Sequence, residues 1–132
     1  MFKLERLNKM VAILVIALSV NANAKMEYPS AENLDSVIFL NSSELKELYT
    51  EHTLSGKNLK FKKNMEIYYS KDGTYKGTVA SGKKKISGTW TIENNSVCSK
   101  GKRGKKCSKL YKDGEQYIIV RENKMISKVK FK

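Results

Sequence analysis

The chain has 132 residues, with 26 Lys and Arg, 13 Asp and Glu and a formal net charge of +13 at pH 7. This length predicts one domain with a single hydrophobic core. Its two cysteines and one histidine do not complete the four ligands of a tetrahedral zinc site, so we expect no metal and no cofactor.

The first 24 residues have the pattern of a secretory signal. Lys3, Arg6 and Lys9 precede an apolar run over residues 10–20, and Ala22-Asn23-Ala24 is an A-x-A cleavage site. The alternative is a transmembrane anchor, but the run is well short of the roughly 20 residues that span a bilayer. We therefore expect a cleaved signal peptide at 1–24, no membrane span after cleavage, and a bacterial protein in the periplasm or secreted.

The mature chain then divides into a lead-in at residues 25–40 and a single β domain at residues 41–132 that begins with a short helix. Asn41 is a typical helix N-cap, with Glu44 three residues on. The helical spacing continues through Leu45, Leu48, Tyr49 and His52, which places His52 at the end of the helix.

From Lys60 the hydrophobic period becomes two residues. The alternation in residues 65–69 and 75–79 around Asp72-Gly73 predicts a hairpin with a tight primed turn. Ile86, Gly88, Trp90 and Ile92 then lie on one face of the next strand, and further strands follow to Phe131. One helix followed by six to eight strands in meander order predicts a mainly β fold, either a small antiparallel barrel or a strongly twisted meander sheet.

Several short motifs occur in a fixed order. They are Thr53-Leu54-Ser55-Gly56, Tyr69-Ser70-Lys71-Asp72-Gly73, Gly88-Thr89-Trp90, Cys98 to Cys107 and Tyr111-Lys112-Asp113-Gly114. In this order the chain resembles small exported bacterial β-sheet proteins of a largely uncharacterised family, over roughly residues 45–120. The resemblance implies an exported one-domain β fold and carries no assigned reaction, and the lysine-rich insert between the cysteines departs from the family pattern.

The only two cysteines, Cys98 and Cys107, bracket a strongly basic loop. In an exported chain such a pair favours a disulfide, whereas a reducing cytosol would leave free thiols. The disulfide would make the loop the tip of a hairpin. The basic residues between the cysteines are Lys100, Lys102, Arg103, Lys105 and Lys106.

Positive charge is concentrated in the second part of the chain. Residues 25–52 contain six acidic residues and two lysines, whereas residues 53–132 contain 21 basic and six acidic residues. This asymmetry favours an anionic partner. We predict that the basic loop and Lys83, Lys84 and Lys85 form an anion-binding site. The alternative is a solvated cationic surface, and the topology decides whether the basic groups converge.

Three other residues are candidates with ordinary structural alternatives. His52 is the natural general base, although a histidine at a helix end is also favoured by the helix dipole. Trp90 could contact an apolar ligand in the barrel, or fill the core. Tyr68 lies on the face opposite Ile67, where tyrosines interleaved with lysines are typical of single-stranded nucleic-acid grooves and equally of ordinary barrels.

Together these features predict a noncatalytic binding module that engages an anionic envelope component or an acidic protein through its disulfide-closed hairpin. A nucleic acid is a less favoured partner, and the oligomeric state stays open. The alternatives are a small carrier of apolar ligands and a periplasmic inhibitor or immunity-type protein. We do not expect an enzyme, because the sequence has no Ser-His-Asp order, paired carboxylates or phosphate-binding glycine loop.

Overall fold

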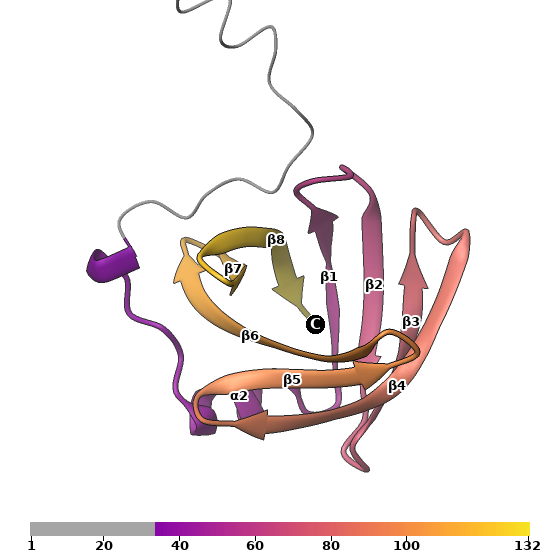
Figure 1. Ribbon diagram of the computed structural model, residues 1–132, viewed down its shortest axis with the longest axis horizontal. Coiled ribbons are helices and arrows are strands. Elements are labelled where there is room, and N and C mark those ends of the chain that lie inside the picture. The colour runs from indigo at the N-terminus through magenta and orange to yellow at the C-terminus, as the bar shows by residue number, and fades with distance from the viewer. Residues whose placement is uncertain (1–33) are drawn as a thin grey trace, which may run out of the picture.

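The computed structural model describes residues 34–132, in which a short helix precedes eight strands (Figure 1). The strands are antiparallel and close into a barrel in the order β1 to β8, with β1 paired to β8. The predicted mainly β fold with one short helix is therefore confirmed, and of its two forms the closed barrel is observed. The predicted signal peptide at 1–24 and residues 25–33 of the lead-in lie outside the described residues.

The elements follow one another with short connections. A 3-10 helix, η1 (Leu34–Ser36), and the α-helix α2 (Ser42–Tyr49) come first. The strands are β1 (His52–Asn58), β2 (Asn64–Tyr69), β3 (Thr74–Val79), β4 (Lys84–Glu93), β5 (Ser96–Gly101), β6 (Gly104–Asp113), β7 (Gln116–Arg121) and β8 (Lys124–Phe131). Neither helix of residues 34–132 has the length and apolar character needed to cross a bilayer.

Helix α2 begins at the predicted cap. The Asn41 side chain accepts from the Glu44 backbone N–H at 2.9 Å, and the Glu44 carboxylate accepts from the Asn41 backbone N–H at 3.0 Å. This reciprocal pair is a capping box. The next residue, Ser42, is tied to the β4–β5 turn by hydrogen bonds with Asn95. The helix is thereby held against one end of the barrel, where its buried residues Leu45 and Tyr49 join the core.

The predicted position of His52 at the end of the helix is wrong. Helix α2 ends at Tyr49, Thr50 is extended, and Glu51 adopts a left-handed conformation with φ 60°. His52 instead begins β1, opposite Tyr69. The sequence pattern missed this strand because it has one buried apolar residue, Leu54, and because Gly56 looked like the end of a helical segment.

The turn at Asp72-Gly73 also differs from the predicted primed type. Only Gly73 has a positive φ, and its backbone N–H donates to the Ser70 carbonyl at 3.1 Å. The connection is therefore a longer loop with a left-handed glycine, a common hairpin form. Primed geometry occurs instead at Asn94-Asn95, where φ is positive at both residues.

The core is densest in aromatic rings near α2. The Tyr49 ring lies 4.7 Å from Tyr69 and 4.8 Å from Phe131, centroid to centroid, and the Tyr69 ring lies 5.6 Å from Trp90. Burial raises the pKa of Tyr49 and of Tyr69 well above 10.0, so both hydroxyls stay neutral in the folded barrel at physiological pH. These rings fill the end of the barrel against which α2 packs.

Gly56 and Gly77 mark places where neighbouring strands approach too closely for a side chain. A Cβ on Gly56 would collide with the Lys128 carbonyl oxygen and lie 2.8 Å from the Val129 Cα. A Cβ on Gly77 would collide with the Glu66 carbonyl oxygen and lie 2.7 Å from the Ile67 Cα. Both positions lie in strands, so the close approach of neighbouring strands in the barrel wall requires glycine there.

We predict that Gly56→Ala destabilises the barrel by about 2 kcal/mol or more, because backbone atoms of β8 must move to admit the methyl group. Urea unfolding followed by circular dichroism measures this free energy. The neighbouring Ser55→Ala is the control and should change the stability by less than about 0.5 kcal/mol. Equal stability of the two variants would show that β8 moves to admit the methyl group without a loss of stability.

Candidate anion-binding end of the barrel

The up-and-down topology sorts the turns to the two ends of the barrel. Because every strand reverses direction, the turns after β1, β3, β5 and β7 all lie at the end opposite α2. We call this the basic end, and it comprises residues 59–63, 80–83, 102–103 and 122–123 with the adjoining strand ends. Its basic residues are Lys57, Lys60, Lys62, Lys63, Lys83, Lys84, Lys85, Lys100, Lys102, Arg103, Lys105, Lys106, Arg121 and Lys124.

The opposite end, which we call the helix end, gathers acidic residues. They are Glu44, Glu47, Glu51, Asp72, Glu93, Asp113 and Glu115, in α2, in the turns after the even-numbered strands and at adjoining strand ends. At the basic end the turns contain one acidic residue, Glu122. The barrel therefore has an electric polarity along its axis.

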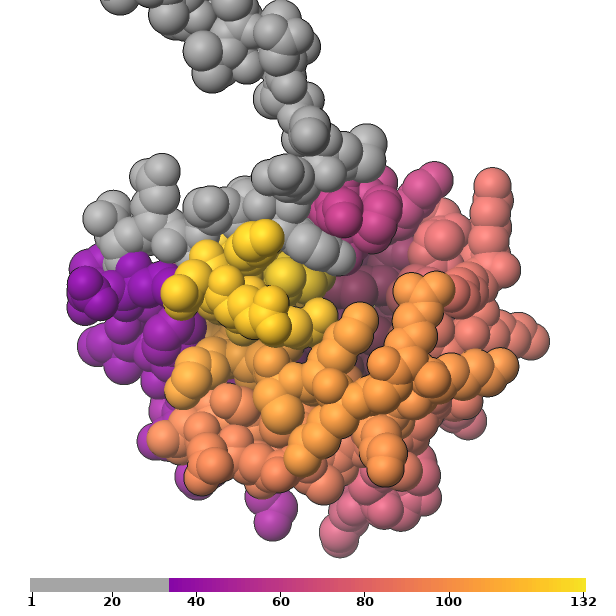
Figure 2. Space-filling view, in the orientation of Figure 1, coloured from indigo at the N-terminus to yellow at the C-terminus, as the bar shows by residue number. Residues whose placement is uncertain are grey.

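The two predicted basic clusters lie at the same end. Lys100 is paired with Thr89 of β4, and a Cβ on Gly101 would lie 3.5 Å from the Ser87 carbonyl oxygen. The β5–β6 turn therefore lies beside the first half of β4, the strand that begins with Lys84 and Lys85. Figure 2 shows long orange side chains of the residue-100 region projecting beside the salmon segment of β3 and β4.

Like charges face each other directly across three strand pairs. Lys57 is opposite Lys128, Lys100 is opposite Lys105, and Arg121 is opposite Lys124. Such pairs destabilise a sheet. Within residues 34–132 only two ion pairs form, Lys105 with Glu93 and Lys132 with Glu66, so most of this repulsion has no compensating carboxylate. A bound anion would relieve it.

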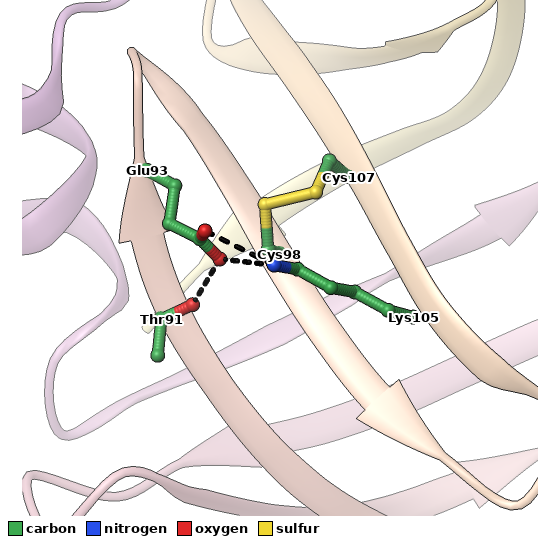
Figure 3. Close-up of polar contacts among 5 residues, drawn as sticks. All are labelled: Thr91, Glu93, Cys98, Lys105 and Cys107. Carbon is green, nitrogen blue, oxygen red and sulfur yellow. Dashed lines mark hydrogen bonds and ion pairs between the residues drawn. A yellow bond between two sulfur atoms is a disulfide. The ribbon is translucent and has the colours of Figure 1, made fainter.

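The predicted disulfide between Cys98 and Cys107 is confirmed, and it lies on the outer wall of the β5–β6 hairpin (Figure 3). The two residues are directly opposite each other, with their Cα atoms 4.0 Å apart. Their sulfur atoms lie within 4.8 Å of a Glu93 carboxylate oxygen. This group has no free thiolate to offer a metal, because both sulfur atoms belong to the disulfide.

Glu93 engages one of the predicted anion-binding residues, Lys105, in an ion pair on the exposed outer wall. Its carboxylate accepts from the Lys105 ammonium, with an Nζ–Oε2 distance of 2.8 Å, and from the Thr91 hydroxyl at 2.8 Å (Figure 3). These hydrogen bonds lower the pKa of Glu93, and the bond from Lys105 has the largest effect. Lys105 therefore extends along the outer wall towards Glu93, and the exposed cations of the hairpin outside this ion pair are Lys100, Lys102, Arg103 and Lys106.

Removing the disulfide by Cys98→Ser with Cys107→Ser should lower the free energy of unfolding by roughly 2.5–3 kcal/mol, because the unfolded chain regains the entropy of an uncrosslinked loop of about ten residues. Urea unfolding of the oxidised protein and of the double variant measures this difference. The variant should keep the far-UV spectrum of the barrel, since β5 and β6 are also joined by a ladder of paired residues. Loss of that spectrum in buffer would show that the crosslink is required for folding.

Arg121 is a cation that points into the barrel. Its Nε donates to the hydroxyl of the buried Ser108 at 3.1 Å, and Ser108 lies opposite Val97 of the core. The charge of Arg121 also acts on Tyr49 and Tyr69, where it opposes the rise in pKa caused by burial. Among the described residues no carboxylate forms an ion pair with Arg121. The interior of the basic end is therefore cationic, like its rim.

We predict that phosphate raises the melting temperature of the protein more than chloride at equal ionic strength, because a dianion offsets the repulsion between Arg121 and Lys124. Arg121→Met should diminish this difference while it preserves the packing of the aliphatic stem. Thermal melts in the two salts provide the measurement, and Lys112→Met at the helix end is the control. An undiminished phosphate effect in Arg121→Met would place the anion elsewhere.

The remaining candidates have separate positions. Trp90 is 8 % exposed, and its indole N–H donates to the Ser70 carbonyl at 2.9 Å, so it is a core residue. Tyr68 is 36 % exposed and lines a surface hollow of about 190 Å³, as expected for the face opposite Ile67. His52 lies at the helix end, far along β1 from the basic turns.

A larger open groove of about 740 Å³ crosses the outside of β8, β1, β2 and β3. Lys57 and Lys128, one of the opposed like-charge pairs, line it together with polar side chains and the Ser81-Gly82 turn. Trp90 lines neither this groove nor the hollow beside Tyr68.

No known protein family, curated protein or solved structure matches this chain. The chain is a small β-barrel protein with one disulfide, and its candidate site rests on its own residues. Sequence reasoning did not single out Arg121 or Lys124 as functional residues. The alternation in β7 places Arg121 on the same face as Ile119, and this signal could have revealed its inward position.

Proposed function

We propose that this protein is an exported, noncatalytic binding module whose basic end engages an anionic component of the cell envelope or an acidic protein. The observation that carries the proposal is the sorting of charge by topology. Four turns that are far apart in sequence lie at one end, with lysines in three of them and at a strand end beside the fourth, while seven acidic residues lie at the other end. Potentials from charges at one end add when they lie within about 8–10 Å, the Debye length near physiological salt.

The proposed contact recognises charge rather than a fixed shape. Of the basic residues in the whole chain, only Arg6, Arg103 and Arg121 are arginines, and the others are lysines. Lysine supplies a flexible point charge, whereas arginine supplies the planar fork that binds one carboxylate or phosphate in a defined geometry. A broad anionic surface therefore suits this end better than a single small ligand on its rim.

Export and a place in the resembled family of small bacterial β-sheet proteins belong to the same proposal. The disulfide supports export, because disulfides persist mainly in oxidising compartments. The final location would then be the periplasm or the medium. The secretory pattern of residues 1–24 is the sequence observation behind this part of the proposal.

The noncatalytic part of the proposal rests on the surroundings of the reactive side chains. In the described range, His52 has no carboxylate in hydrogen-bond contact, and the one cluster of potential metal ligands contains the disulfide. The alternative of an apolar-ligand carrier is not favoured, because aromatic side chains fill the core around Trp90. The proposal includes an inhibitor or immunity-type role, which would apply if the partner is an acidic protein.

Two variants of equal net charge test the proposal. Lys83→Gln, Lys84→Gln and Lys102→Gln neutralise the basic end, and Lys46→Gln, Lys71→Gln and Lys112→Gln neutralise lysines near the helix end. We expect the basic-end variant to elute from polyglutamate and from vesicle-coated beads of anionic lipid at markedly lower salt than the control. The reason is that only its substitutions weaken the polar field of the barrel.

Elution of both variants at the same salt concentration would mean that net charge alone governs retention, and the basic end would then have no special role. Retention that is insensitive to salt would also contradict the proposal, because neutralisation of surface charge weakens with ionic strength.

A further inference from the structure

We propose that the basic end docks on the surface of an anionic lipid bilayer and that Phe61 inserts into it as an apolar anchor. This inference rests on the proposed function and names its partner. It adds a side chain that charge alone does not explain. Phe61 is 52 % exposed in the β1–β2 loop, at the basic end of the barrel.

The sequence around Phe61 is that of an interfacial anchor. Lys60 precedes the ring, and Lys62 and Lys63 follow it. The Lys60 ammonium lies 5.1 Å from the centroid of the Phe61 ring, which is a cation–π distance. Peripheral membrane segments combine these elements, because the ring enters the boundary between head groups and acyl chains while ammonium groups stay with the anionic head groups.

The other exposed large apolar side chains of the described residues lie elsewhere. Ile38, which is 89 % exposed, precedes α2, and Tyr68 lies on the outer wall in β2. An exposed phenylalanine at the tip of the most basic part of the molecule is therefore a specific combination. A solvated cationic surface has no need of it.

The loop holds its shape before it meets a membrane. The Asn58 side-chain oxygen accepts from the backbone N–H groups of Lys60 and Phe61, each at 3.0 Å. The Lys62 N–H donates to the Asn58 carbonyl at 2.9 Å, and the Leu59 N–H donates to the Ile126 carbonyl of β8 at 2.9 Å. A loop ordered in this way loses less conformational entropy on docking than a flexible one.

The charge distribution favours a bilayer over an acidic protein as the occupant. Each lysine close to an anionic membrane adds to the attraction, without any requirement for a matching pocket. The basic residues occupy all four turns or their adjoining strand ends, as a flat charged surface requires. The acidic helix end would be repelled by the same surface, so the field also orients the barrel with Phe61 towards the lipid.

The test is sedimentation of the full mature protein with vesicles of phosphatidylcholine and phosphatidylglycerol in equal parts, compared with pure phosphatidylcholine. We expect binding to the mixed vesicles, and we expect Phe61→Ala to weaken the partition coefficient by roughly tenfold, because most of the apolar area of the ring is lost from the contact. Ile38→Ala is the matched control and should bind like the original protein. Thermal melts of both variants verify that the barrel is intact.

Insertion itself is measured with Phe61→Trp and lipids brominated in the acyl chains. We expect strong quenching in this variant and little in the original protein, whose only tryptophan is the buried Trp90. Equal binding of the original protein and Phe61→Ala, without quenching, would overturn the anchor and leave the proposed function intact. Binding to polyglutamate but not to mixed vesicles would replace the bilayer with an acidic protein. Binding to neither would overturn the proposed function as well.

Discussion

The strict alternation of strand direction around a closed barrel is the constraint on which the rest of the molecule depends. Once eight strands run up and down in chain order, the position of each turn is decided by whether it follows an odd- or even-numbered strand. Segments such as residues 59–63 and 102–103 are then brought to one end without any direct attraction between them. The buried core and the backbone hydrogen bonds between strands hold their like charges together.

The sequence predicted most strands, their meander order and a barrel as one of two forms, but it did not predict the end of the barrel at which each turn lies. The two-residue period from Ile86 to Ile92 predicted β4, and the spacing of Asn41 and Glu44 predicted the helix cap. By contrast, β1 was missed because Gly56 lacks the side chain that would complete its alternation, and close contact with Val129 is the reason for the glycine. The convergence of the basic clusters could not be predicted without the exact number of strands. One strand fewer would move every later turn to the opposite end of the barrel.

The two ends of the barrel differ in their interior side chains as well as in their surface charge. Tyr49, Tyr69 and Trp90 fill the helix end, whereas Arg121 and Ser108 bring polar groups inside the basic end. A core filled with aromatic rings is compatible with binding at the rim, because such binding requires no cavity inside the barrel. Under the proposed function, opposed cations at the rim lower the stability of the barrel in favour of anion binding, a trade common at functional sites.

The pairing of β1 with β8 has a consequence for folding. Seven of the eight strand pairings join neighbours in the sequence, but closure brings Leu54 opposite Phe131. The loop-closure entropy of this pairing is the largest in the barrel, and contacts of such long range slow folding. The β1–β2 loop is joined to β8 by the hydrogen bond from the Leu59 N–H to the Ile126 carbonyl, and this bond forms only when the first and last strands have met. A chain that is still unclosed therefore lacks one of the hydrogen bonds that fix the loop carrying Phe61, and the bonds to Asn58 hold it.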